Sequence, residues 1–216
     1  MNTSTALKSL LGAGALVLPL IAFAESNVQT GAATASSGAT AHVDFAIVIP
    51  KILYLRVGSG SAYTATGTGL TSVNTVDLIT FSPAAGTVGN GTAVAGTGGD
   101  IAGGAAETAA IVSNSGNVTL SATASGAGLS NGNGDTIPFT QITTTPATLT
   151  STTALPAPVL ANGASTTTVV LTAPATKLIV QDAKWTYAYA NAANVPAGTY
   201  GGVANSGRVT YTATMP

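Results

Sequence analysis

Residues 42–57 read HVDFAIVIPKILYLRV and contain two runs in which large apolar side chains recur at every second position. The first run places four of them on one face of an extended chain: Val43, Phe45, Ile47 and Ile49. The second run, which follows Pro50, does the same with three: Leu53, Leu55 and Val57. Successive side chains of a strand point to opposite faces, so a period of two predicts β-structure with one buried face.

The same alternation recurs through the rest of the chain, between clusters of Gly, Ser, Asn and Pro. Further strands are predicted at 72–81, 118–123, 136–143, 167–171, 177–181, 184–190 and 208–214. No long window has the apolar spacing of a helix, and the 36 threonines favour strands because branching at Cβ suits a pleated surface. The pattern predicts an all-β fold, an antiparallel β-sandwich, as a single domain over residues 42–216.

Three low-complexity stretches interrupt this pattern. Residues 25–41 are small and polar, and predict a flexible N-terminal extension. Residues 84–106 are rich in Gly, Ala and Thr and predict a long surface loop, and residues 126–134 predict a cluster of turns.

The first 24 residues have the three parts of a secretory signal peptide. Lys8 supplies a positive charge, residues 10–21 are apolar, and Ala22-Phe23-Ala24 offers small residues at the two positions that a signal peptidase recognises. We therefore expect export and cleavage after Ala24. No later segment is apolar enough for a membrane-spanning helix, so we expect no membrane span in the mature chain.

The composition excludes several kinds of chemistry. Charged residues make up 6% of the chain, and there are no cysteines, so neither disulfides nor thiolate zinc sites can form. Six Lys plus Arg are too few for a basic nucleic-acid surface. The single histidine, His42, lies beside the polar extension and has no recognisable triad around it. The Asn131–Asp135 loop lacks the oxygen ligands that Ca²⁺ needs. We predict no enzymatic activity, no cofactor and no metal.

Trp185, Tyr187 and Tyr189 are the one concentrated aromatic set. On a strand these three rings share a face. They either pack into the core, where aromatic rings contribute large burial energy, or form an exposed platform on which sugars stack. The second alternative describes a secreted carbohydrate-binding or adhesin domain.

The two ends of the predicted mature chain carry its most informative features. A polar extension leads into the alternating run at 42–49, and the last strand, within GRVTYTATMP, has three side chains on its inner face: Val209, Tyr211 and Ala213. An exported all-β domain with these two ends resembles bacterial fimbrial (pilus) subunits of the donor-strand, chaperone–usher type. The absence of cysteine and the position of Tyr211, five residues before Pro216, mark it as a divergent one.

This resemblance implies a structural subunit of a surface fimbria with a role in adhesion or biofilm formation. It also implies an immunoglobulin-like antiparallel β-sandwich that lacks one strand, which the N-terminal segment of the next identical subunit would complete by β-strand addition. The resemblance implies two assembly partners as well: a periplasmic chaperone and an outer-membrane usher. The donated strand is either residues 42–49 or the segment 28–36, which lies closer to the mature terminus. If 42–49 is instead the first strand of the domain, the donor assignment changes but the pilin resemblance does not.

Overall fold

The computed structural model describes residues 26–31, 38–60, 73–163 and 165–216. The predicted signal peptide, residues 25 and 32–37 of the predicted extension and residue 72 of the predicted 72–81 strand lie outside these ranges. Within the described part of 72–81, only Ile79–Phe81 forms a strand. The chain divides into two units, one ending at Ile49 and one formed by Pro50–Pro216. Each unit is described separately below.

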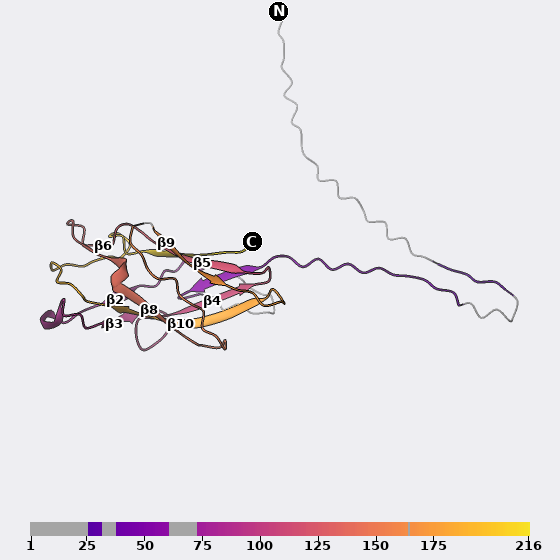
Figure 1. Cartoon of the computed structure of the whole chain (residues 1–216), viewed down its shortest axis with the longest axis horizontal. Coiled ribbons are helices and arrows are strands. Elements are labelled where there is room, and N and C mark those ends of the chain that lie inside the picture. The colour runs from indigo at the N-terminus through magenta and orange to yellow at the C-terminus, as the bar shows by residue number, and fades with distance from the viewer. Residues whose placement is uncertain (1–25, 32–37, 61–72, 164) are drawn as a thin grey trace, which may run out of the picture. The chain divides into compact units, whose positions relative to one another are not determined.

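The unit Pro50–Pro216 consists of antiparallel β-sheets, and its described residues contain no α-helix (Figure 1). Its strands are β1 (Leu53–Val57), β2 (Ile79–Phe81), β3 (Val94–Gly98), β4 (Ala106–Ser113), β5 (Val118–Ala124), β6 (Leu129–Ser130), β7 (Thr136–Ile137), β8 (Ile142–Ala147), β9 (Thr166–Leu171), β10 (Ile179–Tyr189) and β11 (Val209–Thr214). Two single-turn 3₁₀ helices complete it: η1 (Ala85–Thr87) and η2 (Phe139–Gln141).

The larger sheet is built around β10, the longest strand. One edge of β10 pairs with β4 and, at its last two residues, with β3, while the other edge pairs with β8. β1 continues the sheet beyond β4, and β2 continues it beyond β3. The second sheet has the order β11-β5-β9, and β6 and β7 form a separate two-stranded ribbon.

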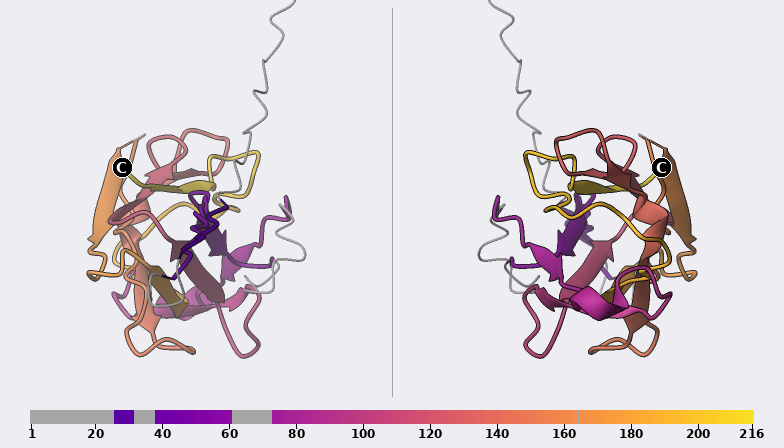
Figure 2. Two further views of the ribbon diagram at one scale, coloured as in Figure 1. Left: turned by 90° about the vertical axis from the view of Figure 1, so that its right-hand side faces the viewer. Right: turned by 90° about the vertical axis from the view of Figure 1, so that its left-hand side faces the viewer.

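Side chains of both larger sheets form one buried cluster, and the end views in Figure 2 show strands on all sides of this interior. Its centre combines residues of β4, β5, β9 and β10: Ala109, Ile111, Val118, Leu120, Leu171, Ile179, Ala183 and Trp185. A second, smaller cluster gathers around Phe139 and Leu160. In β5 every second residue is buried, which is the alternation expected for a sheet with one face toward the core.

The strands predicted at 118–123, 167–171 and 208–214 are present within one residue of the predicted bounds. The two strands predicted at 177–181 and 184–190 are a single strand, β10. The predicted 136–143 strand is wrong, because Pro138, which cannot donate to a ladder, separates β7 from η2 and β8.

The prediction that residues 84–106 form one long loop is also wrong, since β3 lies inside that stretch. β4 was not predicted at all, although it is the most buried strand of the larger sheet. Three of the eight residues in its sequence, AETAAIVS, are Ala and one is Glu, and both residue types have low strand propensity. Burial on both faces also removes the polar–apolar alternation that identifies a half-exposed strand.

Residues 38–49 are described but contain no strand. The alternating run is therefore present as irregular chain, and the first strand of the following unit is β1. In β1 the three predicted inner residues do pack against the core: Leu53, Leu55 and Val57.

Candidate functional site

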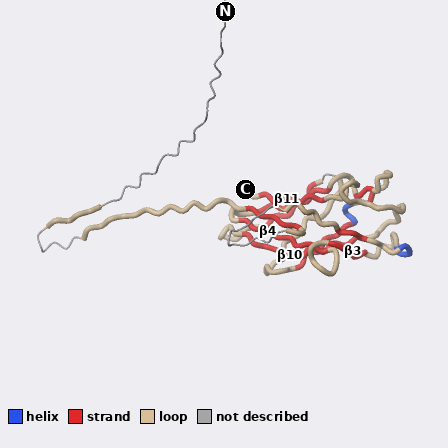
Figure 3. Tube along the Cα trace, turned by 180° about the vertical axis from the view of Figure 1, so that it is seen from behind, coloured by secondary structure: helices blue, strands red, loops and turns tan. Residues whose placement is uncertain are grey.

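Several strands of the Pro50–Pro216 unit have an edge without a ladder among the described residues, and β1 and β11 are two of them. β1 pairs only with β4, and β11 pairs only with β5. β1 and β11 belong to different sheets and lie close to each other without pairing. Figure 3 shows β11 across the domain from β10 and β3. Unpaired backbone N–H and C=O groups at such edges are a template for a further strand.

A groove of about 1460 Å³ follows these two edges. Its lining includes β1, β2, residues of the 73–78 and 195–203 segments and the first half of β11, and these segments are here called its walls. The lining also includes large apolar and aromatic side chains, here called its floor: Leu129, Ile137, Phe139, Ile142, Leu160, Tyr187 and Tyr189. Pockets for small molecules typically measure ~300–1,000 Å³, so this groove is larger than a typical small-molecule pocket.

The C-terminal strand presents its predicted inner face to the interior. Val209, Tyr211 and Ala213 are half-buried and pack against the two core clusters, whereas the residues between them are exposed. Val209 and Tyr211 also line the groove. The strand predicted to form the acceptor edge therefore contributes part of the groove lining.

The three aromatic residues of β10 are buried: Trp185 is 0% exposed, Tyr187 8% and Tyr189 7%. The indole N–H of Trp185 donates to the carbonyl oxygen of Leu155 at 2.8 Å, and its ring lies 5.3 Å from the ring of Tyr211. The hydroxyls of Tyr187 and Tyr211 are 3.3 Å apart. A sugar-stacking platform requires exposed ring faces, so this burial favours the core interpretation of the trio over the carbohydrate-binding one.

Burial raises the pKa of Tyr187 above its ordinary range, and the neighbouring Tyr211 raises it further. The pKa of Tyr211 is raised by burial as well. Both hydroxyls therefore stay protonated at every pH at which the protein is handled, and they add two neutral polar groups to the floor and wall of the groove.

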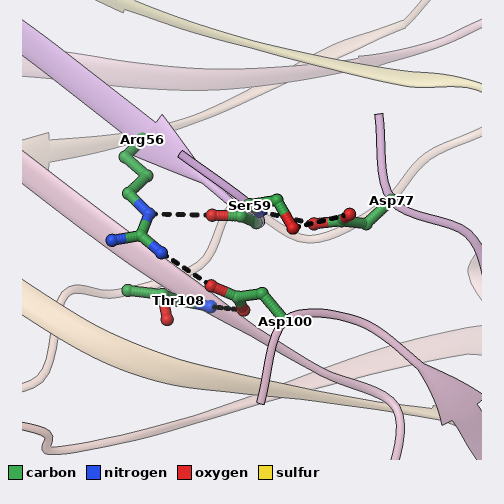
Figure 4. A network of polar contacts seen from close by, with 6 residues as sticks. Arg56, Ser59, Asp77, Asp100 and Thr108 are labelled. Carbon is green, nitrogen blue, oxygen red and sulfur yellow. Dashed lines mark hydrogen bonds and ion pairs between the residues drawn. The ribbon is translucent and has the colours of Figure 1, made fainter. Parts of the chain in front are cut away.

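A polar cluster lies at the end of β1, where the groove passes over β4 (Figure 4). Arg56 Nη2 forms an ion pair with Asp100 Oδ2 at 2.8 Å, and Arg56 Nε donates to the carbonyl oxygen of Gly58 at 2.8 Å. Asp100 Oδ1 accepts the N–H of Thr108 at 2.6 Å. These contacts tie β1 to the loop before β4.

Asp77 joins the same cluster from the segment before β2. Its carboxylate accepts the backbone N–H of Ser59 at 2.5 Å and the Ser59 hydroxyl at 2.9 Å (Figure 4). Burial alone would raise the pKa of Asp77, but the two hydrogen bonds from Ser59, together with Glu107 and Arg56, lower it below its usual value. Asp77 is therefore a carboxylate that holds residues 73–78 against the end of β1.

Sequence reasoning did not identify Glu107, the only charged side chain in the buried face of β4. It is 5% exposed and lines the groove. Burial, with Asp77 as the second cause, raises the pKa of Glu107 to about 8. A lone glutamate inside the apolar run AETAAIVS is the signal that could have identified it, had that run been recognised as a strand.

The four predicted donor side chains are highly exposed. Their exposed fractions are 74% for Val43, 89% for Phe45, 87% for Ile47 and 76% for Ile49. Val48, on the opposite face of an extended chain, is 92% exposed. In the alternative donor segment, Val28 is 81% exposed, and residues 32–36 lie outside the described ranges. Contiguous exposed apolar side chains commonly mark an interaction segment.

The structure also describes the other positions that the sequence analysis considered for chemistry. His42 is exposed, and no group of three His, Cys, Asp or Glu side chains is placed to hold a metal ion in this part of the chain. In the Asn131–Asp135 loop, the Asn131 Oδ1 atom accepts the N–H groups of Asn133 and Asp135, as in a tight turn. None of the helices that the structure describes is long and apolar enough to cross a membrane.

Comparisons with known proteins add no further constraint. No family model matches the chain, and no curated protein or solved structure shows significant similarity to it. Function is therefore argued below from the groove and the N-terminal segment.

Proposed function

We propose that this protein is a structural subunit of a bacterial surface filament, and that subunits polymerise by donating residues 43–49 to the groove of a neighbouring copy. In this proposal the Pro50–Pro216 unit is an immunoglobulin-like sandwich that lacks one strand. The missing strand lies between β1 and β11. It is supplied by a second copy of the chain through β-strand addition.

One observation supports the proposal: a single chain contains both a groove beside two strand edges that are unpaired among the described residues and an exposed segment with the pattern such a groove accepts. Every copy of the chain would therefore carry both parts of a strand-addition interface, the donor segment and the groove. An interface in which one surface of a subunit binds a different surface of the next is head-to-tail, and repetition of it produces a filament.

The dimensions of the two parts agree. Seven residues in extended conformation span ~23 Å at the rise of a strand, and the six residues of β11 span ~20 Å. Backbone hydrogen bonds to β1 and β11 would supply affinity, and the alternate side chains would fill the apolar floor. Burying a Val, Ile or Phe side chain contributes ~1.5–3 kcal/mol, so four such side chains supply a large favourable term.

The connector between the two units favours donation to another copy over self-insertion. The side chain of Asn114 donates to the carbonyl oxygen of Pro50 and accepts the N–H of Ile52, both at 2.8 Å. Lys51 Nζ donates to the carbonyl oxygen of Pro216 at 2.9 Å. These contacts occupy the three residues that would have to form a hairpin turn if residues 43–49 were to pair with β1 of their own subunit.

The wider context follows from the predicted signal peptide and the resemblance to fimbrial subunits. A chain with an open apolar groove needs protection before assembly, which a periplasmic chaperone supplies in that class of protein, and an outer-membrane usher then exchanges the chaperone for the next subunit. We accordingly propose the cell surface as its location, and adhesion or biofilm formation as the role of the filament.

The test uses two full-length variants that each retain one half of the interface. Phe45→Asp damages the donor segment and leaves the groove intact, and Val209→Glu places a charge in the groove and leaves the donor intact. Each variant alone should stay monomeric in analytical ultracentrifugation, and a mixture should form dimers and no longer species. Far-UV circular dichroism checks that both variants are folded. Polymers formed by folded Phe45→Asp alone would overturn the donor assignment.

A further inference from the structure

We propose that Glu107 and Asp77 share a single proton and form a latch that fixes residues 73–78 as a wall of the groove, so that strand docking requires this proton. The inference rests on the proposed function, because it describes how the same groove is regulated. It assigns a role to the buried glutamate that the filament proposal does not use.

Glu107 is placed where an ionised carboxylate is poorly accommodated. It lies on the core face of β4, directly across from Trp185 on β10, and is 5% exposed. Its Oε2 atom has no hydrogen-bond partner of its own. A buried carboxylate oxygen without a donor is costly, and protonation removes that cost because the group then carries its own donor.

The groups around Glu107 do not supply a free positive charge. Asp77 faces it from the segment before β2 and Asp100 from the loop before β4, while Tyr187 of β10 and Tyr211 of β11 approach from the remaining sides. Arg56 of β1, a cation near this site among the described residues, is paired with Asp100 and with the carbonyl oxygen of Gly58. Burial and then Asp77 raise the pKa of the Glu107 carboxyl, and they outweigh a hydrogen bond from the backbone N–H of Asp100 that lowers it.

Gly58 shows how closely the two carboxyl groups meet. It has a φ of +84°, and a Cβ atom at this position would lie 2.7 Å from Glu107 Oε2 and even nearer to Asp77 Oδ2. Both oxygens therefore converge on the same point of the backbone, and only glycine leaves room for them. Two carboxyl groups that approach this closely form a favourable contact when one of them is protonated, and repel each other when both are ionised.

The proton belongs on Glu107 because Asp77 is already an acceptor for two hydrogen bonds from Ser59. A protonated Glu107 can donate to the Asp77 carboxylate, and this contact joins the floor of the groove to the segment that forms its wall. Loss of the proton would place two negative charges together and release that segment. A docked strand would cover Glu107 further, which raises its pKa again. Docking therefore retains the proton, and affinity should fall as the pH rises above the pKa of the free subunit, by at most tenfold per pH unit for one proton.

The first measurement follows the latch in the full chain carrying Phe45→Asp, which keeps the groove free of donor. The Ser59 amide reports directly on Asp77, so its ¹H–¹⁵N resonance should titrate with a midpoint near 8. Glu107→Gln should remove that titration, because the Gln amide donates at every pH. Asp77→Asn should lower the midpoint, because it removes a like charge. Asp135→Asn, which changes a carboxylate outside the groove, should leave the midpoint as it was.

The second measurement follows docking with a fluorescently labelled peptide of residues 41–49 and the same proteins between pH 7 and 9.5. The Kd should increase up to tenfold per pH unit above about 8 in the protein with Glu107 and stay constant in Glu107→Gln. A Ser59 resonance that does not titrate, or titrates equally in Glu107→Gln, would overturn the latch, as would peptide binding with the same pH dependence in both proteins. Absence of peptide binding at every pH would instead contradict the proposed function.

Discussion

Residues 43–49 and β11 have the same sequence pattern and opposite structural outcomes. In both, apolar side chains recur at every second position. β11 pairs with β5 at all six of its residues, and its inner side chains are half-buried. Residues 43–49 form no strand, and Phe45 is 89% exposed. The alternation thus determines which face can be buried, whereas a strand exists only where a second strand satisfies its backbone groups.

The largest effect on polymerisation is expected from a charge on the predicted inner face of the donor segment. Phe45→Asp should abolish polymerisation, because a carboxylate would have to enter the apolar floor of a neighbouring groove. Val48→Asp, three residues later on the opposite face, should polymerise normally. Electron microscopy and sedimentation of the two purified chains distinguish them. Equal loss of polymer in both variants would show that the segment does not dock as an alternating strand.

The next prediction concerns the core beneath the paired strands. Trp185→Ala should lower the free energy of unfolding of the monomer by ~3–5 kcal/mol, the usual cost of removing a large buried aromatic side chain. Ile47→Ala should change that free energy by less than ~0.5 kcal/mol, as is usual for exposed positions, because Ile47 is 87% exposed. Urea unfolding followed by circular dichroism measures both. A large loss for Ile47→Ala would mean that the segment is already part of its own domain.

Sequence patterns were reliable where one face of a strand is more buried than the other. β5, β9 and β11 have that arrangement, and their bounds could be predicted to within a residue. β4 and β3 could not be predicted, because one is an Ala-rich strand buried on both faces and the other contains two glycines. Residues 43–49 could be identified as a candidate donor segment, because their alternation of apolar side chains is visible in the sequence whether or not the segment is paired.

Only part of the candidate site could be predicted from the sequence, because some of its residues meet only through the pairing of distant strands. Val209 and Tyr211 follow from the alternation of the last strand, and the structure places both at the groove. Asp77 and Glu107 are 30 positions apart, and their convergence at Gly58 depends on the pairing of β1 with β4. No local pattern contains that pairing, so contacts between distant acidic residues had to come from the structure.

A third prediction concerns the stability of the paired sheet at acid pH. Asp182 of β10 accepts hydrogen bonds from the N–H groups of Thr150 and Ser151, at 2.9 and 2.8 Å, and from both of their hydroxyls. Burial would raise the pKa of Asp182, but these hydrogen bonds outweigh it and lower the pKa to about 2.

Because the folded pKa is depressed, the stabilisation from Asp182 is present above the ordinary value of 3.8 and is lost as the pH falls toward 2. Asp182→Asn should therefore be less stable than the parent chain at pH 6, and the difference should shrink between pH 4 and pH 2. Thermal unfolding at a series of pH values provides the measurement. A difference between the two chains that is the same at pH 6 and at pH 2 would contradict this role of Asp182.

The smallest expected effect concerns the hydroxyl groups of Tyr187 and Tyr211, which lie at the groove. The 3.3 Å contact between Tyr187 and Tyr211 is a weak hydrogen bond, so Tyr187→Phe should cost the free monomer no more than ~1 kcal/mol. A docked apolar strand would exclude water from this place, and the Tyr211 hydroxyl would then be left without a partner. The same substitution should accordingly destabilise the polymer more than the monomer. A double-mutant cycle with Tyr211→Phe, measured on both forms, isolates the pair, and equal coupling in monomer and polymer would show that the strand does not cover these hydroxyls.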